Sequence, residues 1–155
     1  MTTFKVFLLV VGLLLGGYLY VLIYKSRNNF SEYLRFPVAL DAGQMTSFVI
    51  GILLHLVFPL KFIVSCAMNL WIGAFISIFF CLTQKSQSVS ASFFCGGLAA
   101  IMGTMVGAAA INPTLCGLPM SRLPIQNPSL AVGIFGVVLL GIAALLVKYS
   151  LKNDI

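Results

Sequence analysis

Charged residues are scarce in this chain. Only 8% of its 155 residues are Asp, Glu, Lys or Arg, and only three of these are acidic. A soluble domain needs a charged surface, and this sequence cannot supply one, which excludes an ordinary water-soluble globular protein. We also expect no acid within any membrane span, and this argues against a proton- or sodium-coupled transporter.

Motifs for catalysis and for cofactor binding are missing as well. The sequence contains no nucleotide-binding loop, no HExxH and no CxxC pair. Its one histidine, His55, has no second ligand in any predicted span, so we interpret it as a hydrogen-bonded core residue. The sequence therefore predicts a protein that is not an enzyme and that binds no cofactor and no metal.

Hydrophobic residues make up most of the chain. They make up 61% of the chain, the mean hydropathy is +1.11, and they occur in runs of the ~20 residues that cross a bilayer. The pattern predicts one all-α integral membrane domain over residues 1–155, a polytopic transmembrane helical bundle of four or five spans. We expect these spans at about 4–24, 46–60, 62–82, 93–111 and 129–147.

The number of spans depends on the long apolar stretch 46–83. The sequence FPLKF breaks it, because Pro59 cannot continue a helix cleanly and Lys61 favours the interface. The first piece, 46–60, is short, so a tilted span and a re-entrant arm both fit; five spans are favoured and four are the alternative. The polar segment 25–44 precedes it, and its FPVALDAG half is expected to form an interfacial turn or a short surface helix.

The basic residues indicate orientation. They occur singly at segment ends and give a net charge of +6, a pattern typical of membrane topology and lipid headgroup attraction and not of direct nucleic-acid binding. With five spans, the side of the C-terminus holds more of them and is predicted to be cytoplasmic, in a bacterial-type inner (plasma) membrane. With four spans the count decides nothing. The two groups are Lys25, Arg27, Arg35, Lys85, Lys148 and Lys152 on that side, and Lys5, Lys61 and Arg122 on the other.

Small residues recur at every fourth position in several apolar segments. Residues four apart lie on nearly one helix face, and small side chains there let helices approach closely in a bilayer. This small-xxx-small pattern predicts tight helix packing and a homo-oligomer, without saying whether the partner helix belongs to the same chain. The predicted packing residues are Gly12, Gly16, Gly73, Ala99, Gly103 and Gly107.

Four polar residues lie within the apolar segments. Ser65, Asn69 and Ser77 lie four or eight residues apart in one span, and His55 lies in the preceding one. Their side chains need hydrogen-bond partners inside a membrane. Two interpretations stay open, which are an interhelical clasp and a polar path for a solute.

Residues 96–118, GGLAAIMGTMVGAAAINPTLCGL, resemble the second signature of YeeE/YedE-type sulfur-compound transport proteins in their Gly-Gly-Leu run, Gly-Thr pair and closing Cys-Gly-Leu. The resemblance implies that Cys116 is a thiol that passes on a sulfur-containing solute. The Gly-Cys pair that the family carries midway is replaced here by Ala109-Ala110.

Two functions follow from these observations. The first is a non-catalytic multi-pass membrane subunit that oligomerises and acts by contacting a partner protein, as in toxin immunity, phage exclusion or defence sensing, or membrane anchoring. A cytosolic partner would then contact the segments 25–44, 83–92 and 148–155. The alternative is a passive channel or a small-solute transport protein, with a sulfur compound as the solute that the resemblance implies.

Overall fold

The structure is a computed structural model that describes residues 2–25, 32–82, 89–112 and 127–153. In this part of the chain five α-helices are long and apolar enough to cross a membrane, which confirms the predicted all-α helical bundle. These helices are α1 (Thr2–Lys25), α2 (Glu32–Val57), α3 (Phe62–Leu82), α4 (Val89–Ile111) and α5 (Pro128–Asn153).

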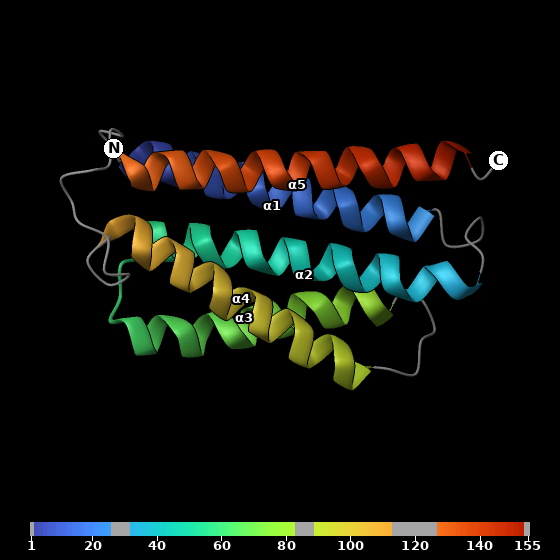
Figure 1. Ribbon diagram of the computed structural model, residues 1–155, viewed down its shortest axis with the longest axis horizontal. Coiled ribbons are helices and arrows are strands. Elements are labelled where there is room, and N and C mark those ends of the chain that lie inside the picture. The colour runs from blue at the N-terminus through green and yellow to red at the C-terminus, as the bar shows by residue number, and fades with distance from the viewer. Residues whose placement is uncertain (1, 26–31, 83–88, 113–126, 154–155) are drawn as a thin grey trace.

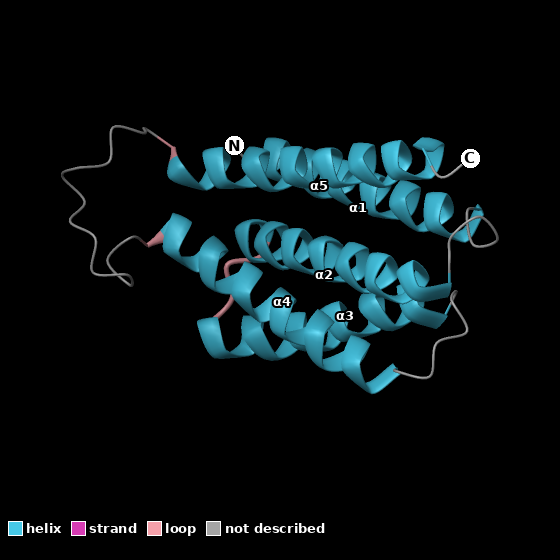
Figure 2. Ribbon diagram, turned by 45° about the vertical axis from the view of Figure 1, so that its right-hand side comes forward, coloured by secondary structure: helices cyan, strands magenta, loops and turns pink. Residues whose placement is uncertain are grey.

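Helix α2 lies at the centre of the bundle and contacts all four others. Figure 1 shows α1 and α5 side by side along one side of α2, with α3 and α4 crossing each other on the opposite side. The turned view in Figure 2 shows the same two groups. The start of α1 and the end of α5 lie at opposite ends of the bundle, as an odd number of crossings requires.

Proline and asparagine set several helix ends. Pro59 follows the end of α2, where the amide of Phe58 makes a last hydrogen bond of 2.8 Å to the carbonyl of Leu54. Helix α5 begins at Pro128, a first-turn position where a missing N–H costs nothing, and the carbonyl of Asn127 accepts the first bonds. The expected break between the second and third segments therefore lies at FPLKF.

The structure differs from expectation at the start of α2. We expected an interfacial turn or a surface helix over 36–43, but these residues continue α2, and the candidate span is Phe36–Val57. Pro37 and Asp41 lie one turn apart on the exposed face, while Ala39, Ala42 and Gly43 are buried on the other. Asp41 therefore lies within a span, near its start, although we expected no acid within any span.

Two other segments are also more helical than expected. Residues 89–92, which precede the expected span 93–111, form the first turn of α4, and Ser92 is fully buried. Helix α5 continues past 147 to Asn153, so part of the expected C-terminal tail is helical. Residues 26–31, 83–88 and 154–155 of the predicted contact segments lie outside the described residues.

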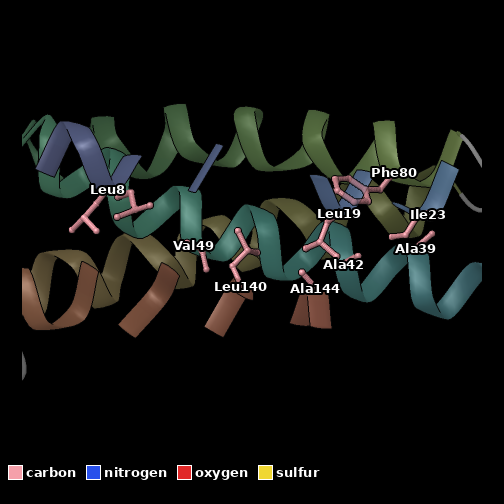
Figure 3. Close-up of a cluster of buried hydrophobic side chains, with 10 residues drawn as sticks. Leu8, Leu19, Ile23, Ala39, Ala42, Val49, Phe80, Leu140 and Ala144 are labelled. Carbon is pink, nitrogen blue, oxygen red and sulfur yellow. The ribbon is translucent and has the colours of Figure 1, made fainter. Parts of the chain in front are cut away.

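The largest hydrophobic cluster joins α1 and α5 to α2 and to the end of α3. Figure 3 shows Leu19 and Ile23 of α1 close to Phe80 of α3, with Leu140 of α5 beside Val49 of α2. The outward faces carry many exposed large apolar side chains, for example Trp71, Phe75 and Phe79 on α3. Such faces suit contact with lipid tails.

Candidate functional site

The small and polar residues of α2 and α3 face one another in an antiparallel ladder. Each polar residue of one helix lies opposite a small residue of the other, except at the end next to the α2–α3 turn, where two polar residues meet. The facing pairs are Gly43–Ser77, Ser47–Gly73, Gly51–Asn69 and His55–Ser65. Ser47, His55, Ser65, Asn69 and Ser77, together with Thr104 of α4, are called the polar seam below.

The two ends of the ladder make different hydrogen bonds. Near the turn, Nδ1 of His55 lies 2.8 Å from Oγ of Ser65. Farther along, Oγ of Ser47 lies 2.8 Å from the carbonyl oxygen of Gly43 in its own helix and 2.9 Å from that of Gly73 in α3. The serine can donate its one proton to either carbonyl. When it donates to Gly73, it forms a hydrogen bond between α2 and α3.

Asn69 connects three helices at the middle of the seam. Its Nδ2 donates to Oγ1 of Thr104 in α4 over 2.7 Å and lies 3.4 Å from the carbonyl oxygen of Gly51 in α2. Thr104 in turn donates its own proton to the carbonyl of Ala100 over 2.8 Å. Asn69 and Thr104 are both buried, so the amide of Asn69 acts as a clasp between the three helices.

Glycine allows α4 to lie against both α2 and α3. A Cβ added at Gly103 would collide with the carbonyl of Phe48, and one at Gly107 would lie 3.2 Å from the carbonyl oxygen of Ile52. On the other side, a Cβ at Gly73 would lie 2.6 Å from the carbonyl oxygen of Gly96. The helices approach backbone to backbone, which only residues without a Cβ permit.

The other predicted packing residues occupy different contacts. A Cβ at Gly12 would lie 2.8 Å from Cδ1 of Leu53, and one at Gly16 would lie 2.8 Å from Cγ2 of Thr46, so α1 packs its glycine face on α2. Ala99 is only half-buried and lines a cavity between α2, α4 and α5. Its neighbour Ala100 is the residue that faces Gly51 and Gly73.

Ser77 is the exception within the seam. It is fully buried between Gly43 of α2 and Gly96 of α4, yet its Oγ has no hydrogen-bond partner among the described residues. Nearer the same end of α3, Oγ of Ser92 donates to Sγ of Cys81 over 2.6 Å, and both side chains are fully buried. This contact fixes the first turn of α4 against the end of α3.

The site contains few groups that could hold a metal or act as a nucleophile. Within the described ranges no three His, Cys, Asp or Glu side chains gather as a metal site. Cys66, Cys81 and Cys95 are free thiols. Cys116, the thiol implied by the resemblance to the sulfur transport family, lies outside the described residues. The described side chains of the polar seam are hydroxyl, amide and imidazole groups, all of which form hydrogen bonds.

Sequence reasoning missed Thr104, Gly96, Gly43 and Ser92. The spacing of the first three is a signal that could have found them. Gly43 lies at fourfold spacing before Ser47, Gly51 and His55, but within the stretch expected to form an interfacial turn or a short surface helix. Gly96 and Thr104 belong to the neighbouring stripe Gly96, Ala100, Thr104, which shares the face of Gly103 and Gly107.

Comparisons with protein families, with curated proteins and with solved structures found no match to this chain. The local resemblance of residues 96–118 to the YeeE/YedE signature therefore rests on those residues alone.

Proposed function

We propose that this chain is a non-catalytic, multi-pass membrane subunit that acts by contacting a partner protein, in the manner of an immunity protein, a phage-exclusion or defence sensor, or a membrane anchor. The observation that supports this function best is the internal use of the polar seam. Its imidazole, the NH2 group of its amide and all but one of its hydroxyls make hydrogen bonds within the bundle, and none of its described residues is Asp, Glu, Lys or Arg. A partner protein would therefore contact the outer surface of the bundle.

The structure narrows the surfaces that we propose for a cytosolic partner. Ala39, Ala42 and Gly43 of the predicted segment 25–44 are buried in the bundle, as is Ser92 of the segment 83–92. Exposed residues of those two segments, such as Asp41 and Val89, thus alternate with buried ones. The end of α5 is different, because residues 148–150 are all exposed and no buried residue lies among them. We therefore place the main contact at 148–155, on the side of the bundle where basic residues are most frequent and which we propose to be cytoplasmic.

A homo-oligomer remains part of the proposal, with a changed interface. The predicted packing glycines of α1, α3 and α4 face helices of the same chain, so they are not free to pack against a second copy. Any contact between copies would use outward faces such as that of Trp71, Phe75 and Phe79.

Purification in mild detergent followed by native mass spectrometry tests this function. We expect a soluble protein to remain bound in a fixed ratio, and expect Lys148→Glu with Tyr149→Ala to remove it while the bundle still elutes as one species. Lys5→Glu, a change at the opposite end, is the matched control and should retain the partner. Purified chain with nothing bound in every extraction, wild type included, would contradict the proposal.

The second candidate is a passive channel or a small-solute transport protein. The fully buried, unpartnered Oγ of Ser77 favours it, because a hydroxyl of this kind could contact a passing solute. Asn69→Leu with Ser77→Ala should then abolish solute flux into liposomes while assembly persists. Cys116→Ala should abolish flux only if the solute is a sulfur compound. Loss of assembly without any flux in the wild type would assign the seam to packing.

A further inference from the structure

A cavity next to the polar seam suggests a small-molecule site. It has a volume of about 260 Å³ and lies between the end of α2 and the first half of α3. Ser65 and Asn69 of the seam supply its polar groups. Its remaining walls are apolar: Leu54, Phe58, Leu60, Met68 and Ile72. It is called the α2–α3 pocket below.

The hydrogen bonds of Asn69 decide what this residue offers to the pocket. Thr104 has one hydroxyl proton and donates it to Ala100, so its oxygen must accept from Asn69, which therefore presents its NH2 group to Thr104. The second N–H is directed at the carbonyl of Gly51. The amide oxygen, Oδ1, has no hydrogen-bond partner among the described residues, although Asn69 is 96% buried. Because Asn69 lines the pocket, Oδ1 is the group that can accept a hydrogen bond from a ligand there.

Ser65 provides the second polar group. When Nδ1 of His55 carries a proton and donates it to Oγ of Ser65, the serine keeps its own proton for a ligand. Ser65 and Asn69 lie one turn apart on the same face of α3, so both can reach one ligand atom. A hydroxyl fits both groups, since it donates to Oδ1 of Asn69 and accepts from Ser65.

The rest of the pocket restricts the ligand to a neutral, mostly apolar molecule. None of its lining side chains is charged. Phe58, Leu60 and Met68 are exposed at its rim, so entry is from the surface that faces lipid. The volume is slightly below the ~300 Å³ at which drug-sized sites begin. It suits a short-chain alcohol or the hydroxyl-bearing end of a larger lipid.

We propose that the α2–α3 pocket binds the hydroxyl group and adjoining apolar chain of a small neutral amphiphile, with Oδ1 of Asn69 accepting the hydroxyl proton. This site goes beyond the proposed partner contact at 148–155 and does not depend on it. Partner binding and pocket binding can therefore fail separately.

Photolabelling of the full chain in lipid nanodiscs tests the site. The probe is an octanol that carries a diazirine, and its methyl ether is the matched control probe, because the ether keeps the oxygen acceptor but lacks the donor. We expect saturable labelling within residues 54–72 that is about five-fold stronger for the alcohol, as loss of one hydrogen bond implies. Equal labelling by the two probes, or labelling that does not saturate, would overturn the proposal.

A pair of substitutions on α3 locates the ligand without touching the seam. Met68→Trp fills the rim of the pocket and should reduce the alcohol's labelling at least five-fold. Val64→Trp places the same bulk on an exposed position outside the pocket and should leave labelling unchanged. Equal labelling of the two variants would overturn the site.

Competition then identifies the source of the ligand. Displacement of the probe by a few mole per cent of diacylglycerol in the nanodisc would support the site and assign it to a neutral membrane lipid. Displacement by unlabelled octanol but not by diacylglycerol would support the site and assign it to a small free alcohol. Displacement by neither would overturn the proposal.

Discussion

The two sides of α2 are held together by different interactions. On one side, α3 and α4 approach α2 backbone to backbone through glycine, and the polar seam adds hydrogen bonds between the helices. On the other side, Gly12 and Gly16 of α1 meet side chains of α2 and not its backbone. Larger apolar residues such as Leu19 and Leu140 fill the rest of that contact. Within residues 3–25 of α1 and 128–150 of α5, no side chain makes a hydrogen bond to another described residue.

This difference matters because the surroundings are lipid. Lipid tails are as apolar as leucine, so burying Leu140 against another helix gains less than it would in water. Close backbone contact and hydrogen bonds have no equivalent in the bilayer and can specify which helices pair. We infer that α2, α3 and α4 form the specific core of the bundle. Two cavities of about 380 and 300 Å³ lie along the boundaries of α1 and α5, and the smaller α2–α3 pocket lies at one end of the core.

The largest effect is expected from adding one methyl group within this core. In Gly96→Ala the new Cβ would lie 2.6 Å from the carbonyl oxygen of Gly73 and would also collide with Ser77. Backbone cannot move away cheaply, so we expect a loss of about 3 kcal/mol or more in the free energy of unfolding. SDS-titrated unfolding in mixed micelles measures it.

Gly141→Ala is the matched control in α5, where a Cβ would meet nothing within 4 Å. It removes a helix-weakening glycine without creating a clash, so stability should be unchanged or should rise by up to about 1 kcal/mol. Equal losses for the two variants would remove the distinction between the two sides of α2.

A smaller effect is expected from the clasp at the centre of the core. A double-mutant cycle with Asn69→Leu and Thr104→Val should give a coupling free energy of about 1 kcal/mol, the scale of hydrogen bonds between membrane helices. Thr46→Val is the control for Thr104→Val, because Thr46 donates only to Ala42 within its own helix. A cycle of Asn69→Leu with Thr46→Val should show no coupling. Zero coupling between Asn69 and Thr104 would mean that glycine packing alone pairs α3 with α4.

The break between α2 and α3 and the bounds of α3 could be predicted from the sequence. The contact between the small and polar faces of these two helices was not predicted, although the sequence contains the signal for it. The break at Pro59 and the bounds 62–82 follow directly from hydropathy and one proline. The stripes Gly43, Ser47, Gly51, His55 and Ser65, Asn69, Gly73, Ser77 read in opposite directions from that break, so an antiparallel hairpin places small residues opposite polar ones. Complementary stripes on adjacent helices are a signal for contact within one chain.

Other features could not be read in this way. Pro37 and Asp41 suggested a helix end, because propensity describes one residue at a time and cannot show that both would lie on the exposed face of a helix. Nor does spacing show that Ala100, and not Ala99, occupies the crossing. That choice depends on how α4 is rotated about its axis, which is set by its contacts with two helices at once.

The smallest effect is expected at Ser77, where the specific core contains a hydroxyl without a partner. Removing an unpaired buried hydroxyl removes only its desolvation cost, so Ser77→Ala should change the free energy of unfolding by less than about 0.5 kcal/mol or should stabilise the bundle slightly. Ser47→Ala is the matched comparison, because it loses the bond to Gly73 and should cost about 1 kcal/mol. A loss at Ser77 as large as that at Ser47 would show that the hydroxyl has a partner in the membrane, and a water or solute bound between α2, α3 and α4 would then favour the transport function over the partner-binding one.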